Sequence, residues 1–315
     1  MSNLNKSAEQ INRALGQLLK KGEREIAKKY ANTLNEIRKA LTEVYERYET
    51  DGVLTYAEMA RYDRLRKLLN KVNRLLEINY KSLKQTIYDV LGESYLDGYY
   101  LTAWAVETDT LSRLAYATVA ADVITAMIEN PVSGLTLSER LEKNRTNIIY
   151  AIQQEITQGL VKGETYGTMA KRLKDQLEGD ATKAMRIVRT EAHRASETGK
   201  LDSAVHANKN GVVMMKEWNS MQDERVRPGR GIGKADAKHA ANHRILDGKK
   251  IPVDDDFVGK LGKGPGPGQM GAAGEDINCR CFLTYSVEKI IKPDAKELEN
   301  MTFEDWKKER MKSNG

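Results

Sequence analysis

The first 48 residues repeat apolar side chains at intervals of three and four, the spacing that places them on one face of an α-helix. Lysine and glutamate fill the remaining positions, so the other faces of such a helix are suited to water. The pattern therefore predicts one long amphipathic helix, or two in series. Its apolar positions are Leu4, Ile11, Leu15, Leu18, Leu19, Ile26, Leu34, Ile37, Leu41, Val44, Tyr45 and Tyr48.

Helical patterning continues through the next 160 or so residues. Thr55 followed three positions later by Glu58 is typical of a capping box, which opens a helix. Only 6 Pro and 3 Phe occur in 315 residues, which argues against a β-sandwich or a proline-rich linker protein. We expect helical segments over about 55–127, 136–156, 164–178 and 180–208. The first ends before Asn130-Pro131, and the last ends at Asn210-Gly211.

The patterning changes after Gly211. Residues 212–218 favour a strand, Asp247-Gly248 favours a hairpin within 245–251, and the glycine-rich stretch 262–274 favours a loop. Residues 277–287 alternate with a period of two, which places Cys279, Cys281, Leu283 and Tyr285 on one strand face. The fold class that follows is mainly α with a small α+β C-terminal domain, in which a helix packs on a small antiparallel sheet.

Composition divides the chain in the same way. Residues 1–180 hold 26 basic and 25 acidic side chains, 181–250 hold 15 and 8, and 251–315 hold 10 and 12. We expect a helical N-terminal region over 1–180, an α+β domain over 181–290, and a charged C-terminal helix or tail over 291–315. No apolar stretch reaches the roughly 18 to 20 residues of a membrane-spanning helix, and the polar start lacks the apolar core of a signal peptide, so a cytosolic protein is expected.

The basic excess of 181–250 suits a polyanion such as double-stranded DNA, because cationic side chains release counterions on binding. A solvated helix face or a loop that serves a protein partner is the alternative. The candidate residues for binding DNA or a partner are Arg186, Arg189, Arg194, Arg225, Arg227, Arg230 and Lys234.

A possible structural zinc site is the strongest local constellation of side chains. Cys279-x-Cys281 and His239-x-x-x-His243 supply four ligands, the number that a closed zinc site takes, and Asp223 is a substitute. The spacing is not that of a zinc finger, and two same-face strand cysteines reach one metal only with distortion. The alternative is that both cysteines are small buried core residues, with no cofactor bound.

Catalytic motifs are missing from the sequence. Gly262-Lys-Gly-Pro-Gly-Pro-Gly lacks the G-K-[ST] ending of a phosphate loop, and neither G-x-S-x-G nor H-E-x-x-H occurs. Arg189-Thr190-Glu191 is similar to an arginine and glutamate at a nucleotide site, but a helix carries such charges anyway. The expectation is a protein that is not an enzyme.

One ordered set of motifs resembles the phage Mu F-like minor head protein family, also called phage head morphogenesis proteins. The set runs from Arg189-Thr190-Glu191 through Trp218, Asp223-x-Arg225-x-Arg227, His243-x-x-Leu246-Asp247-Gly248 and a Gly/Pro loop to Asn278-Cys279-Arg280-Cys281. It covers residues 180–290. The stretch between Arg227 and His243 is longer than in most members, which leaves His243, Cys279 and Cys281 as the better metal candidates.

The resemblance implies a non-enzymatic virion component present in few copies inside the capsid, beside the portal protein. Its implied partners are the portal, the capsid and scaffold proteins and non-specific double-stranded DNA, without a membrane, and it passes through the host cytoplasm during assembly. Head assembly, DNA packaging or DNA ejection would be its task. The competing hypothesis is a metal-dependent enzyme acting on nucleic acid or a nucleotide, with Glu275 or Asp276 as general base.

Overall fold

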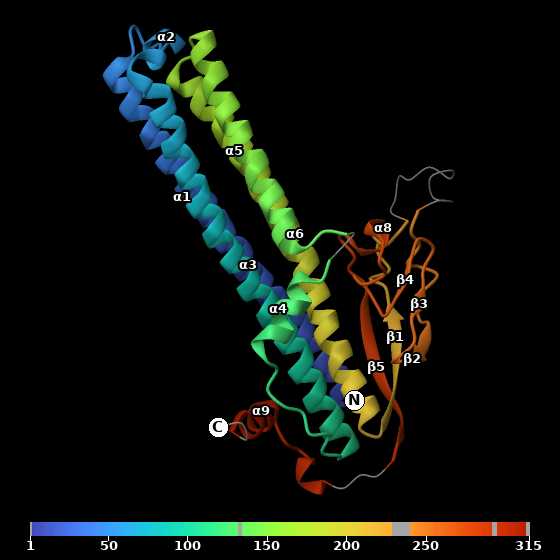
Figure 1. Ribbon diagram of the computed structural model, residues 1–315. Coiled ribbons are helices and arrows are strands. Elements are labelled where there is room, and N and C mark those ends of the chain that lie inside the picture. Colours follow the sequence, from blue (N-terminus) through green and yellow to red (C-terminus); the bar gives the residue numbers. More distant parts are fainter. Residues whose placement is uncertain (1, 132–133, 229–239, 292–294, 313–315) are drawn as a thin grey trace. The chain divides into compact units, whose positions relative to one another are not determined.

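The structure is a computed structural model that describes residues 2–131, 134–228, 240–291 and 295–312 (Figure 1). It is mostly helical, with small antiparallel sheets in the C-terminal part, as the sequence predicts. The helices are α1 (Asn3–Tyr48), α2 (Tyr56–Ala60), α3 (Arg64–Thr110), α4 (Ala121–Glu129), α5 (Leu137–Lys162), α6 (Tyr166–Lys209), α8 (Ala273–Asp276) and α9 (Phe303–Lys312), with 3-10 turns at Arg61–Asp63 and Lys296–Leu298.

Two compact units make up the chain, and each is assembled from separate stretches of sequence. The helical unit comprises residues 21–88 and 137–187, and the sheet unit comprises 1–20, 89–136 and 188–315. The boundaries expected at residues 180 and 290 were drawn from changes in sequence pattern and charge, not from contacts. They stay a prediction about which segments have separate functions.

The helical unit buries the apolar stripes of α1, α3, α5 and α6. As predicted, the Thr55 side chain caps α2 by accepting a hydrogen bond from the amide of Glu58. The expected break near Asp180 is wrong, because α6 continues through it. The buried carboxylate of Asp180 accepts hydrogen bonds from the hydroxyls of Tyr30, at 2.6 Å, and Tyr80.

The sheet unit is built on a three-stranded antiparallel sheet of order β2-β1-β5, whose strands are β1 (Val212–Asn219), β2 (Lys250–Pro252) and β5 (Phe282–Ile290). Trp218 of β1 pairs with Leu283 of β5. A second pair joins β3 (Phe257–Val258) to β4 (Lys263–Gly264).

The second half of α6 lies along β5 (Figure 1). Lys200 donates from Nζ to the carbonyl of Leu283 at 3.1 Å, and the amide of Leu283 donates to the Glu197 carboxylate at 2.8 Å. These contacts fix the start of β5, and with it the segment that carries both cysteines, on the helix.

Three details differ from the expectation. The hairpin predicted within 245–251 is not formed, because residues 245–248 are turns and β2 pairs with β1 instead. The helix expected up to about residue 127 ends at Thr110, and α4 is separate. The last helix starts only at Phe303, and its Trp306 is buried with Nε1 donating to Glu107 at 2.6 Å.

Candidate metal site and basic cavity

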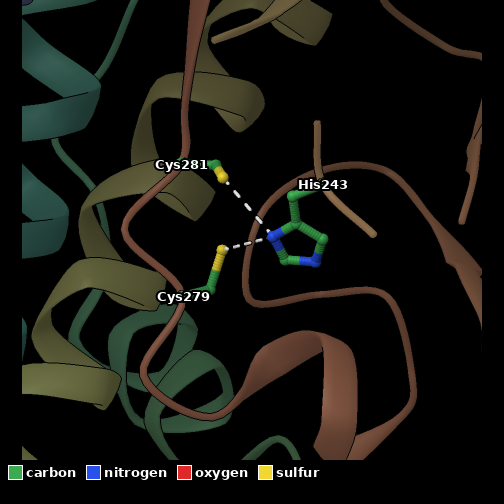
Figure 2. A group of neighbouring side chains, drawn as sticks. All are labelled: His243, Cys279 and Cys281. Carbon is green, nitrogen blue, oxygen red and sulfur yellow. Dashed lines mark hydrogen bonds between the residues drawn. The ribbon is translucent and has the colours of Figure 1, made fainter. Parts of the chain in front are cut away.

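Three sequence-predicted ligands come together inside the sheet unit. Sγ of Cys279 lies 3.5 Å and Sγ of Cys281 lies 3.4 Å from Nδ1 of His243. Figure 2 shows both sulfurs directed at this one ring nitrogen. All three residues are buried, and their ligand atoms lie within 4.8 Å of one another.

The His243-x-x-Leu246-Asp247-Gly248 motif holds the histidine in place. The amide of His243 donates to the carbonyl of Arg227 at 3.1 Å, and Leu246 is buried. Asp247 accepts a hydrogen bond from the amide of Ser220 at 2.7 Å, and Gly248 takes a φ of +72°. The Asp-Gly pair therefore closes the loop after β1 and starts β2, which explains why it forms no hairpin of its own.

The cysteine segment is an extended stretch that precedes β5 and follows α8. Asn278 has a left-handed φ of +58°, and the amide of Cys279 donates to the carbonyl of Asp276 at 3.2 Å. The predicted alternation is confirmed, since Cys279, Cys281, Leu283 and Tyr285 are all buried. Because Cys279 and Cys281 lie outside the paired part of β5, the ladder geometry that we expected to keep two same-face cysteines apart does not constrain them.

Glu275 completes the cluster from the far side of the imidazole ring. Its Oε2 lies 2.6 Å from Nε2 of His243, while its Oε1 accepts from the amides of Lys260 at 3.0 Å and Leu261 at 2.9 Å. The carboxylate is fully buried. Sequence reasoning considered Glu275 only as a catalytic base, because nothing in a separation of 32 residues signals a contact with His243.

The two thiols and the imidazole of His243 shift one another's pKa values. The contact with Cys281 holds the pKa of the Cys279 thiol well below its usual range, and His243 adds to the effect. The same contact raises the pKa of Cys281, and burial raises it further. Burial alone would lower the pKa of His243, but Cys279 and Glu275 raise it to about 9. Without an ion, these shifts favour a Cys279 thiolate beside a protonated His243. A soft metal ion that binds here would displace the protons of His243 and Cys281, because metal ligands must be deprotonated.

Two of the other metal candidates do not join the cluster. Both oxygens of the Asp223 carboxylate accept from Arg280, at 2.5 and 2.7 Å, so this residue serves an ion pair. His239 lies outside the described residues.

The arginine candidates fall into different groups. Arg194 is buried, pairs with Glu191 at 2.9 Å and donates to the carbonyls of Met127 and Ile128, so it does not fit the expected role at a binding surface. Arg227 donates to the carbonyl of Glu275 at 2.7 Å and to that of Ile277. Three candidates are exposed, namely Arg186 in the helical unit and Arg189 and Arg225 in the sheet unit, whereas Arg230 and Lys234 lie outside the described residues.

A cavity of about 590 Å³ in the sheet unit brings two of the exposed arginines, Arg189 and Arg225, together. Arg189, Arg225 and Arg280 line it, beside the apolar side chains of Leu15 and Phe282. Sequence reasoning missed Arg280 and Phe282 as cavity residues, because the alternation within 277–287 shows only that they share a face opposite to the cysteines. The cavity combines positive charge with an apolar wall.

Comparison with known proteins decides the family. The chain is 31% identical over 315 residues to the minor head protein GP7 of Bacillus phage SPP1, a match that covers 97% of this chain and 98% of that protein. The chain belongs to the phage Mu F-like family of minor head proteins. The family model described as phage Mu protein F like protein matches residues 150–231, so it starts earlier than the expected motif set and ends before the cysteines.

A second relative is a named enzyme. The chain is 26% identical over 321 residues to the NAD(+)--arginine ADP-ribosyltransferase EFV of Enterococcus faecalis. The match takes in 100% of this chain but only 62% of that protein. No solved structure matches the chain. Among the described residues, no helix of this Mu F-like protein has the length and apolarity needed to span a membrane.

Proposed function

We propose that this minor head protein lies inside the phage capsid beside the portal protein, in few copies, and supports head assembly, DNA packaging or DNA ejection. The observation that carries the proposal is the similarity to a minor head protein along nearly the full length of both chains. Within this proposal the capsid and scaffold proteins are further partners, and the protein passes through the host cytoplasm before it enters the head.

The helical unit offers a surface for the contact with the portal. Tyr62 has 80% of its surface exposed, and Tyr56 and Val161 are exposed by 44% and 66%. Tyr56 belongs to α2, Tyr62 to the 3-10 turn that follows it, and Val161 to the last turn of α5. Helix α2 contacts α5, at one end of this unit (Figure 1). Exposed apolar side chains that gather in this way mark protein interfaces more often than isolated ones do.

The experiment is co-expression of the chain with the portal, scaffold and major capsid proteins of its phage, followed by gradient purification of procapsids. The protein should co-purify with portal-containing particles and be missing from particles made without portal. Tyr62→Lys together with Val161→Lys should abolish incorporation, whereas Tyr150→Lys, at a side chain equally exposed on α5, should not. Equal incorporation with and without the portal would overturn the proposal.

DNA contact is the second part of the proposal, and it is assigned to Arg189 and Arg225 at the basic cavity. Both side chains are exposed, whereas Arg194 is buried and Arg227 is only partly exposed. Replacing Arg189 and Arg225 with alanine should weaken non-specific binding and reduce the slope of log K against log salt concentration by about 2.

Arg13→Ala with Arg66→Ala is the matched control, because it removes the same charge from two side chains that are each 72% exposed elsewhere. Equal loss of affinity in both pairs would mean that net charge alone attracts DNA. In that case the assignment to the cavity would be wrong.

A catalytic function is not part of the proposal. The stretch that matches the transferase also matches a minor head protein over nearly its whole length, so the shared property need not be the transferase reaction. We expect no consumption of NAD⁺ by the purified chain in the presence of arginine-containing acceptors. Turnover that disappears in an Arg189→Ala or Glu191→Gln variant would establish the enzyme hypothesis instead.

A further inference from the structure

We infer that His243, Cys279 and Cys281 bind one Zn²⁺ ion, with water as the fourth ligand, and that this ion joins the loop after β1 to the segment before β5. The inference is independent of the proposed function in the phage head. It rests on four observations: the distances between ligand atoms, the neighbour of the histidine, the charge balance and a small cavity.

The distances match those of a tetrahedral centre. With Zn–S bonds of about 2.3 Å, Zn–N bonds of about 2.0 to 2.1 Å and tetrahedral angles, a sulfur and a nitrogen on the same ion lie about 3.6 Å apart. The two sulfurs lie 3.5 and 3.4 Å from Nδ1 of His243. Both sulfur–nitrogen distances therefore fit one ion, and all three ligand atoms lie within 4.8 Å of one another, where the same geometry places two sulfurs about 3.8 Å apart.

Glu275 supplies the partner that zinc-binding histidines commonly have. A metal-bound imidazole usually donates its other N–H to a carboxylate, which fixes the ring and its tautomer. Here Nδ1 faces the sulfurs, and Nε2 faces Oε2 of Glu275 at 2.6 Å. The second oxygen of Glu275 is held by two backbone amides, so the carboxylate itself is fixed in position.

The charges of the three ligands match the charge of a zinc ion. Two thiolates and one neutral imidazole cancel the charge of Zn²⁺, so the centre is neutral in a site where every ligand is buried. A catalytic cysteine would need only one thiol beside the histidine, whereas here both sulfurs face the same ring nitrogen.

Room for the fourth ligand exists next to the three side chains. A cavity lined by His243, Cys279 and Cys281, together with Arg225 and Arg227, has a volume of about 10 Å³. This volume corresponds to about one water molecule.

The test begins with the full-length wild-type chain. Purified from zinc-supplemented cells under reducing conditions and dialysed, it should contain one zinc per chain by mass spectrometry of the metal. Titration with a mercurial reagent should release this zinc to a chromophoric chelator as both thiols react. Replacement by Co²⁺ should give a sulfur-to-cobalt charge-transfer band and the visible bands of a tetrahedral ion.

Variants separate ligation from folding. Cys279→Ser, Cys281→Ser and His243→Asn should lose zinc, and His206→Gln, whose ring contacts the carbonyl of Leu114, should retain it. Glu275→Gln should keep the ion but bind it about 10- to 100-fold more weakly. A wild-type chain with no zinc and no cobalt bands would overturn the inference, as would a Cys279–Cys281 disulfide in the protein freshly isolated from reducing cytoplasm.

Discussion

Gly199 of α6 faces the carbonyl oxygen of Tyr95 of α3 so closely that a β-carbon on the glycine would lie 2.1 Å from that oxygen. Gly98 has the same relationship to Ser196, with a distance of 2.4 Å. The two glycines therefore let the backbones of α3 and α6 approach one another within the sheet unit. Any side chain at either position must push the helices apart.

We predict that Gly199→Ala lowers the free energy of unfolding by about 2 kcal/mol or more, because the overpacking penalty exceeds the gain of roughly 1 kcal/mol that alanine brings to a helix. Gly179→Ala is the control in the same helix, where a β-carbon meets nothing within 4 Å. It should be neutral or stabilising. Urea unfolding followed by circular dichroism measures both, and equal behaviour of the two variants would refute the close-packing argument.

Arg227 should matter for stability, and Arg225 should not. Arg227→Ala removes hydrogen bonds to the carbonyls of Glu275 and Ile277, at a cost of about 1 to 3 kcal/mol. Arg225 is exposed, so its replacement by alanine should change stability by no more than about 0.5 kcal/mol. Thermal unfolding of the two single variants tests this contrast, which would fail if Arg225→Ala were the more damaging.

The buried Lys216 of β1 predicts a stability that rises with pH. Its Nζ has no hydrogen-bond partner among the described residues, and burial lowers its pKa to about 8 despite the nearby carboxylates of Asp254, Asp255 and Asp256. The unfolded chain, with a pKa near 10.5, binds the proton more tightly. Stability should therefore increase between pH 8 and 10.5, by up to about 3 kcal/mol.

Lys216→Met should abolish this dependence and stabilise the protein at pH 7, where both states of the wild type carry the charge. Lys250→Met, at an exposed position of β2, is the control and should leave the slope unchanged. Denaturant unfolding at a series of pH values gives the slopes. A Lys216→Met variant with the wild-type slope would assign the pH dependence to other groups.

Asp180 and its two tyrosines should behave as one unit. Tyr30→Phe or Tyr80→Phe alone should cost about 1 to 2 kcal/mol, because the buried carboxylate keeps one donor. The double variant should cost more than the sum, since the carboxylate then has neither hydroxyl donor. A double-mutant cycle measures the difference, with the exposed Tyr150→Phe as control, and strict additivity would contradict the prediction.

The sequence predicted the elements whose signal is local and periodic. Helix α1 and strand β1 match the expected ranges closely, because their burial follows a simple period. The helix break expected near residue 180 and the hairpin expected at Asp247-Gly248 do not form, for one reason. The carboxylates of Asp180 and Asp247 accept hydrogen bonds from groups distant in sequence, two tyrosines in one case and Ser220 in the other, and these tertiary contacts outweigh the local pattern.

The same distinction holds for the candidate site. The residue types of His243, Cys279 and Cys281 are sufficient to predict them as metal ligands. That both sulfurs lie next to one nitrogen of the histidine is visible only in the structure. The contact of Glu275 with His243 could not be predicted, because it depends on how the short helix α8 is placed. Arg194 was misjudged because a charged residue in a helical pattern usually faces water, whereas here its guanidinium reaches the carbonyls at the end of α4.

The sheet unit is assembled from three separate segments of the chain, so it can complete its fold only after the helical unit has been synthesised. All residues of the helical unit have been added once residue 187 is made, whereas the core of the sheet unit combines Leu4 and Trp104 with Trp306. At a translation rate of about 5 to 20 residues per second, the N-terminal turn of α1 waits roughly 15 s or more for its last core partner. Folding of the sheet unit is thus completed only after translation, and a nascent chain stalled before α9 keeps an unfinished apolar core accessible to chaperones or to a neighbouring copy.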